Sequence, residues 1–193
     1  MFPDLARDDV FRIETRRLWL RWPQARDAAA IIRLAGERTV ADMTARIPHP
    51  IDPLAIDSFV IEARRCNTEG EGLAMALTLR AAPTALIGIV SIGPHPAGPG
   101  AHLGYWLGTP HWGEGLMSEA AATMVGAYFA YAGGDVLSSA SMTANIRSRR
   151  VLEKCGFVRQ GSDRQAFPAR GEEREVDLFR LTRAEWSAAR SDG

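Results

Sequence analysis

The chain has 193 residues, 46% of them hydrophobic, and its 23 basic side chains balance 23 acidic ones. This length supports a packed core without disulfides or metals, and the balanced charge gives no overall field that would favour nucleic acid or an anionic membrane. The two cysteines lie far apart without metal-ligand spacing, no stretch holds 18 consecutive apolar residues, and the first residues are too charged for a signal peptide. We therefore expect one domain over 1–193, with its core at about 13–186, in the cytoplasm, without metal, membrane or nucleic acid.

The first part of the chain predicts a strand, a short helix and a loop. Apolar and polar side chains alternate from Ile13 to Trp22, which is typical of a half-buried strand. The apolar residues of 27–35 follow a helical period. Residues 38–52 show no clear period, and we expect a loop there.

A second helix and a hairpin follow. Pro53 is suited to the first turn of a helix with Asp52 as its N-cap, and this helix should end near Gly70. Residues 73–79 and 86–92 then read as two strands joined by a short turn.

A glycine turn marks the middle of the chain. The apolar run 103–107 predicts a strand, and 116–131 carries a long helical pattern, with Gly113 and Gly115 between them. Glycines let backbone amides approach a ligand, and the first amides of a helix lack partners inside it, so the turn can attract phosphate. A plain structural turn is the alternative interpretation.

The last part alternates strands and helices. A strand is expected over 136–142, followed by a helix from the N-cap Asn145 to Gly156. Two final strands are expected at 157–158 and 175–181, separated by a polar loop. Thr182 then begins a capping box and a terminal helix. This element order predicts an α/β fold with a mixed sheet covered by helices.

Three motifs occur in order along the chain: Glu14-Thr15-x-Arg17-Leu18-x-Leu20-Arg21; Gly104-Tyr105-Trp106-Leu107 followed by Trp112-Gly113-x-Gly115-x-Met117-x-Glu119-Ala120; and Asn145-x-x-Ser148-x-x-Val151-Leu152-x-Lys154-x-Gly156-Phe157. Together they resemble the GNAT superfamily of acyl-CoA N-acyltransferases, and most of all its branch with the ribosomal-protein-alanine N-acetyltransferases. The resemblance implies an α/β (α+β) fold with a mostly antiparallel central sheet. It also implies that strand 103–107 splays from strand 136–142 and leaves a slot for the acyl-CoA.

The resemblance further implies how acetyl-CoA is held. The backbone amides of 113–118 would bind its pyrophosphate, and an amide near 106–108 would polarise the thioester carbonyl. Asn145 and Ser148 would face acetyl-CoA, and Arg149 would approach its adenosine phosphate. Asn145 as a plain cap and Arg149 as a solvated charge are the alternatives. The expected donor-binding residues are Trp106, Leu107, Trp112, Gly113, Glu114, Gly115, Leu116, Met117, Ser118, Asn145, Ser148 and Arg149.

The expected catalytic residues are His102, Ser148 and Asn145. Many relatives carry a thiolate-protonating tyrosine where this chain has Leu152, so Ser148 or a water would supply that proton. His102 occupies the place of a glutamate base in relatives, and an imidazole with a pKa near 6.5 could serve an α-amine directly or through water. A structural role for His102 is the alternative.

The resemblance thus predicts an N-acetyltransferase that moves acetyl from acetyl-CoA directly to a primary amine, either a protein N-terminal α-amine or a small-molecule amine. A catalytically idle acyl-CoA-binding module is the alternative, and a nucleotide site lacks the other residues of the known phosphate-binding loops. We expect the loops near 38–52 and 161–174 to choose the acceptor, and family resemblance is compatible with a homodimer.

Overall fold

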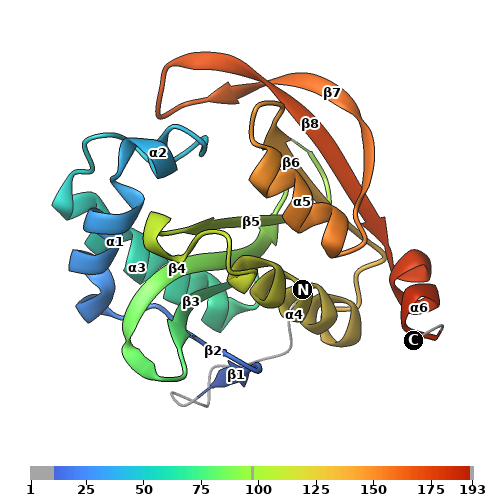
Figure 1. The fold of residues 1–193 in the computed structure, drawn as a ribbon, viewed down its shortest axis with the longest axis horizontal. Helices are drawn as coiled ribbons and strands as arrows, with labels where there is room; N and C mark the ends of the chain where they lie inside the picture. Colours follow the sequence, from blue (N-terminus) through green and yellow to red (C-terminus); the bar gives the residue numbers. More distant parts are fainter. Residues whose placement is uncertain (1–10, 97, 192–193) are drawn as a thin grey trace.

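The structure is a computed structural model that describes residues 11–96 and 98–191. One eight-stranded sheet, in the order β1-β2-β3-β4-β5-β6-β8-β7, forms its centre (Figure 1). The strands are β1 (Arg12–Glu14), β2 (Leu18–Arg21), β3 (Leu73–Leu79), β4 (Ala82–Pro94), β5 (Ala101–Leu107), β6 (Val136–Met142), β7 (Val158–Phe167) and β8 (Glu172–Thr182). The helices are α1 (Ala28–Ala35), α2 (Arg38–Ala41), α3 (Pro53–Glu69), α4 (Leu116–Tyr131), α5 (Ile146–Lys154) and α6 (Arg183–Ser191), with short 3-10 turns at Ala25–Asp27 and Thr109–His111. The mixed, mostly antiparallel sheet predicted from the sequence is confirmed.

The strands β5 and β6 separate from each other in the middle of the sheet. They are the parallel neighbours in an otherwise antiparallel sheet, and they pair only at Ala101 with Leu137 and at His102 with Ser138. The serine hydroxyls of Ser138 and Ser139 donate to the carbonyl oxygens of Ala101 and Leu103, at 2.7 and 2.8 Å. These contacts close one end of the gap, and the predicted slot opens beyond them.

The strand predicted over 13–22 is two strands, which corrects the sequence-based expectation. Thr15 makes the turn between β1 and β2, because its amide donates to the carbonyl of Leu18 at 3.0 Å and its hydroxyl accepts from the amide of Leu18 at 2.9 Å. A threonine side chain in this local role competes with continued strand pairing. The predicted loop 38–52 likewise contains the one-turn helix α2. The lead residues 1–10 lie outside the described residues.

The helix caps formed as predicted. The carboxylate of Asp52 accepts from the amide of Leu54 at 3.0 Å, and Gly70 ends α3 with a φ of 69°. Thr182 and Glu185 exchange the hydrogen bonds of a capping box at the start of α6.

The prediction of a loop over 161–174 is wrong, because most of these residues belong to the strands of the long hairpin β7–β8. Nearly every side chain of β7 before Phe167 is exposed or half-buried, so the strand has no apolar period that the sequence could reveal. The hairpin tip packs on the segment after α2: the amide of Ala169 donates to the carbonyl of Ala45 at 3.1 Å. Arg170 also lies 3.3 Å from the carboxylate of Asp42, and we call the hairpin turn 168–171, bound in this way to residues 42–45, the strap.

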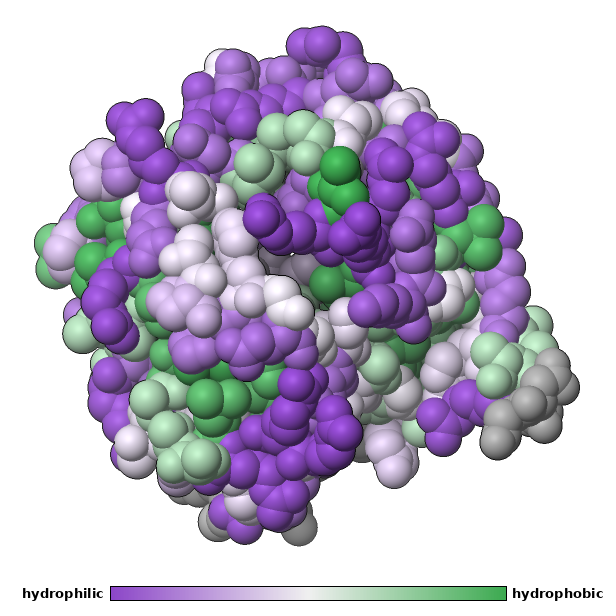
Figure 2. Space-filling view, viewed as in Figure 1, coloured by the Kyte–Doolittle hydropathy of each residue, from purple (hydrophilic) through white to green (hydrophobic). Residues whose placement is uncertain are grey.

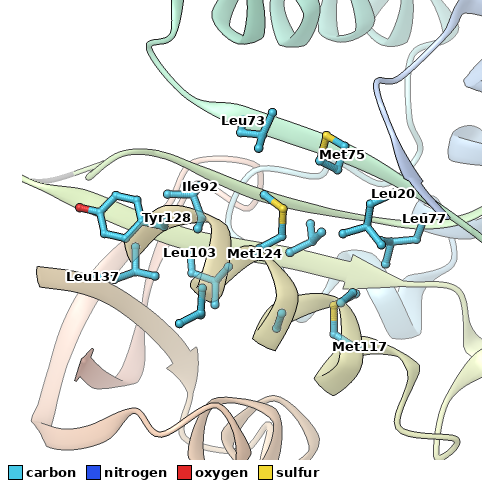
Figure 3. Packing of buried hydrophobic residues seen from close by; sticks show 14 of the residues in the cluster. Leu20, Leu73, Met75, Leu77, Ile92, Leu103, Met117, Met124, Tyr128 and Leu137 are labelled. Carbon is cyan, nitrogen blue, oxygen red and sulfur yellow. The ribbon is translucent and has the colours of Figure 1, made fainter. Parts of the chain in front are cut away.

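Two apolar clusters lie on opposite faces of the sheet. The larger packs α4 against the strands, with Leu73, Met75, Leu103 and Met124 among its buried members (Figure 3). The smaller packs α1 and α3 against the other face and includes Ile31, Leu34, Ile56 and Ile89. The sheet is therefore covered on both sides around β5. Within the described ranges, none of the helices has the length and apolarity needed to cross a membrane.

Candidate active site

The glycine turn presents the start of α4 to solvent. Gly113 and Gly115 adopt left-handed backbone conformations with φ of 82° and 75°, which side-chain-bearing residues rarely adopt. A Cβ placed on Gly113 would meet no atom within 4 Å, so the backbone there borders open space. No side chain caps the helix among the described residues. The uncapped amides at the positive end of the helix dipole form a site for an anion.

Two residues near the chain start hold this turn in place. The carboxylate of Glu119 in α4 accepts from the hydroxyl of Thr15 at 2.6 Å and from the Nε of Arg17 at 2.7 Å. Arg17 also donates to the carbonyl of Glu114, in the turn itself, at 2.8 Å. Although burial alone would raise the pKa of Glu119, the bonds from Thr15 and Arg17 lower it. The turn is therefore fixed by an ion pair between Glu119 of its own motif and Arg17, which lies about a hundred residues earlier in the chain.

A cleft of about 1650 Å³ runs from this turn through the gap between β5 and β6. Figure 2 shows a hollow near the middle of the view, where Figure 1 places β5. We call residues 113–118 and α5 the donor half of the cleft. The acceptor half comprises residues 43–48 and 51, Phe59, His102 and residues 163–168 of the hairpin. Ten of the twelve residues predicted to bind the donor line this cleft; Glu114 and Arg149 do not.

The backbone of β5 shows which predicted amide faces the slot. The amide of Gly108 donates to the carbonyl of Ile87 in β4 at 2.9 Å, so it is not available to a ligand. Backbone groups of successive strand residues point to opposite edges, and the amide of Leu107 therefore points away from β4. The carbonyl of Leu107 points the same way, away from β4, because it accepts a hydrogen bond from the indole of Trp112 at 2.7 Å.

Ser148 meets a tyrosine across the slot. Its hydroxyl lies 2.9 Å from the hydroxyl of Tyr105, and the Tyr105 hydroxyl also lies 3.1 Å from the Ser148 carbonyl. Burial raises the pKa of Tyr105, so its hydroxyl keeps its proton. Asn145 caps α5 by accepting from the amide of Ser148 at 3.1 Å, and it also lines the cleft. Leu152, in the place of the family tyrosine, is fully buried and offers no acid.

The position of Arg149 does not support its predicted role at a phosphate. Its guanidinium lies 2.5 Å from the carboxylate of Asp177, which is only 1% exposed and also binds Arg159 at 2.7 Å. Burial would raise the pKa of Asp177, but hydrogen bonds from Arg159, Ser162 and Arg149 lower it. The cations that line the cleft on α5 are instead Arg147, Arg150 and Lys154. The helical spacing of three arginines could not show which of them faces the slot.

His102 lies at the acceptor end, but with a different ionisation from the one expected. Burial, then the nearby charges of His95 and Arg46, lowers the pKa of His102 to about 4, which corrects the expected value near 6.5. The ring is therefore neutral at pH 7, and its Nδ1 is buried with no hydrogen-bond partner in the described part of the chain. Across residues 11–96 and 98–191, no group of three or more His, Cys, Asp or Glu side chains is placed to hold a metal ion.

The chain matches the acetyltransferase (GNAT) domain over residues 17–158. It belongs to the GNAT acetyltransferase family. It is similar to the probable N-acetyltransferase YjcK of Bacillus subtilis, at 35% identity over 37% of this chain and 39% of that one. The chain thus aligns with less than half the length of the curated relatives that it matches.

Solved structures share the fold over almost the whole chain. Ribosomal-protein-S5-alanine acetyltransferase from Vibrio fischeri superposes with a TM-score of 0.76 at 18% identity, covering 91% of this chain and 98% of that one. RimJ of Mycobacterium smegmatis, solved in complex with a CoA-disulfide, superposes with a TM-score of 0.74 at 23% identity, covering 98% and 97%. At these identities the likeness supports the fold alone.

Proposed function

We propose that this protein transfers acetyl from acetyl-CoA directly to a primary amine, without a covalent enzyme intermediate. One observation carries the proposal: a single cleft runs from the uncapped glycine turn through the gap between β5 and β6 to the acceptor half on the other side. A binding module would need only the first of these features. Both cysteines are unsuited to carry the acyl group, because burial raises the pKa of Cys155 to about 12 and Cys66 does not line the cleft.

In this proposal the donor half holds the phosphates and organises the acyl transfer. The amides of 116–118 bind the pyrophosphate, with Arg147 and Arg150 beside them. The amide of Leu107 faces the thioester carbonyl and stabilises the negative charge that develops on its oxygen during attack. When the carbon–sulfur bond breaks, the Ser148 hydroxyl passes a proton to the departing thiolate and takes one back from water, and Tyr105 orients that hydroxyl.

The acceptor half receives the amine in its neutral form. An α-amine with a pKa near 8 costs only about 1.4 kcal/mol to deprotonate at pH 7, so a strong base is not needed. Neutral His102 accepts a hydrogen bond from the amine or from a bridging water, and bulk water removes the proton. This requirement favours an α-amine, of a polypeptide or of a small molecule, over a lysine side chain.

The test is an acetyl-transfer assay of the purified chain with acetyl-CoA, read by thiol release and by the mass of the product. The panel contains N-terminal peptides, amino acids and small amines. We expect saturable transfer to at least one α-amine class. Absence of CoA binding would overturn the proposal, and CoA binding with background turnover on every amine would favour an idle binding module.

A further inference from the structure

The cleft is strongly positive although the whole chain is neutral. Its described lining contains five cationic side chains, on Arg46, Arg147, Arg150, Lys154 and Arg164, and one carboxylate, on Asp163. The chain as a whole carries equal numbers of basic and acidic residues. The excess of positive charge is therefore local to the cleft, and a ligand must account for it.

The phosphates of the donor account for the three cations on α5 but not for those at the opposite end. Arg164 is compensated locally, since its Nε lies 3.5 Å from the carboxylate of Glu173. The carboxylate of Asp163 accepts from the amide of Arg164 at 2.8 Å and is also engaged. Arg46 is exposed, and no carboxylate lies within ion-pair distance of it in residues 11–96 and 98–191. One uncompensated cation thus remains in the acceptor half.

The strap holds the segment that carries Arg46 near His102 in the acceptor half. Ala45, its neighbour in the chain, accepts from the amide of Ala169, and Arg174 donates to the carbonyl of Asp42 at 3.1 Å. The charge of Arg46 reaches His102, whose pKa it lowers. The segment that carries Arg46 is therefore held against the hairpin, on the same side of the sheet as the imidazole.

Apolar side chains make up much of the rest of this half. Met43 and Phe59 are 40% and 38% exposed, and both side chains line the cleft. An acceptor with a second ammonium group would face Arg46, and the one carboxylate that lines this half, on Asp163, accepts a hydrogen bond from the adjacent amide of Arg164. An acceptor that is apolar next to its amine and carries a negative charge further along would fit both the apolar side chains and Arg46.

We propose that the preferred acceptor is a primary amine carrying a carboxylate beyond an apolar segment, and that Arg46 binds this carboxylate. The inference rests on the proposed acetyl transfer and narrows its acceptor class. The carboxylate can come from an acidic side chain of a peptide or from the side chain of a small free amino acid, and the experiment separates these two sources.

The experiment compares matched acceptors at fixed acetyl-CoA. One arm uses C-terminally amidated peptides that differ only in carrying Glu, Gln or Lys at residues two to four. The other arm uses free glutamate against free glutamine, which differ only at the side-chain carboxylate. For the source that is correct, attraction of one exposed pair should make kcat/KM about threefold higher for the acidic member than for the neutral one. Repulsion adds to this in the comparison with a basic member, where we expect about tenfold.

Charge reversal then assigns the effect to Arg46. Arg46→Glu should reverse the order of the Glu and Lys peptides, and Arg46→Gln should abolish the difference. Arg33→Glu is the matched control, because Arg33 is exposed on α1 and does not line the cleft. This variant should rank the Glu, Gln and Lys peptides as the unmodified protein does. Thermal unfolding checks that each variant folds.

Two outcomes would overturn the inference while leaving acetyl transfer intact: equal kcat/KM for acidic and basic acceptors, or a preference that Arg46→Glu does not change. Transfer to no amine at all would instead overturn the proposed function itself.

Discussion

The donor and acceptor halves of the cleft are built from different parts of the chain and by different means. The donor half relies on backbone amides, on two glycines with positive φ and on a helix end, whose conformations follow from local sequence although Arg17 and Thr15 hold the turn in place. The acceptor half relies on side chains from three distant segments, which the strap brings together. This difference indicates that the donor half is suited to bind the same ligand whatever the acceptor, whereas single substitutions in the acceptor half can change which amine it binds.

The largest effect is expected from Ser148→Ala in the donor half. Loss of the proton donor to the thiolate should lower kcat about 100-fold while the KM for acetyl-CoA stays nearly constant. Tyr105→Phe keeps the serine hydroxyl and loses only the hydroxyl beside it, so its kcat should fall less. Steady-state kinetics of thiol release measures both. A Ser148→Ala enzyme with unchanged kcat would exclude this residue as the acid.

Glu119→Gln should loosen the donor half from outside the cleft. The charged bonds from Thr15 and Arg17 contribute about 2 kcal/mol to the free energy of unfolding. Because the pKa of Glu119 is lowered in the folded chain, this contribution is complete above its unfolded pKa near 4.3 and disappears as the pH falls through the lower folded value.

Denaturant unfolding of the unmodified protein and of Glu119→Gln should therefore differ most near pH 7 and converge toward pH 3. Glu14→Gln is the control, since its carboxylate is half-exposed and lies 3.8 Å or more from its arginine partners. A constant difference at every pH would contradict the role of the charge.

Gly113→Ala should weaken acetyl-CoA binding about tenfold, because a left-handed alanine costs about 1–2 kcal/mol. Calorimetric titration with CoA measures the change. Gly126→Ala in the middle of α4 is the control: its Cβ would also meet nothing within 4 Å, but a helical alanine should leave CoA affinity unchanged. Equal affinity in both variants would mean that the turn does not carry the phosphate.

The smallest effect is expected from His102→Gln in the acceptor half. With a pKa of about 4, His102 is already neutral above pH 5, so it adds no ionisation near neutrality. The value of kcat/KM should rise with pH toward the acceptor amine's pKa near 8, and His102→Gln should keep this profile with a change of less than about threefold. A limb near pH 6.5 that disappears in the variant would show instead that His102 is the base.

The same division explains what the sequence could predict. Asp52, Asn145 and the glycines of the turn act within a few residues of themselves, so their roles follow from spacing. The strand β7 is exposed along most of its length and shows no apolar period, so the sequence does not reveal it. The Tyr105–Ser148 contact joins residues 43 positions apart, and the pKa of His102 depends on distant Arg46. Such contacts exist only once the fold has formed.

The gap between β5 and β6 has a kinetic consequence. Because the cleft passes through the sheet, the proposed reaction would let its two substrates approach from opposite directions, with neither having to leave before the other enters. Initial-rate plots against either substrate should therefore intersect rather than run parallel. Free CoA, as a product, should compete with acetyl-CoA and not with the amine.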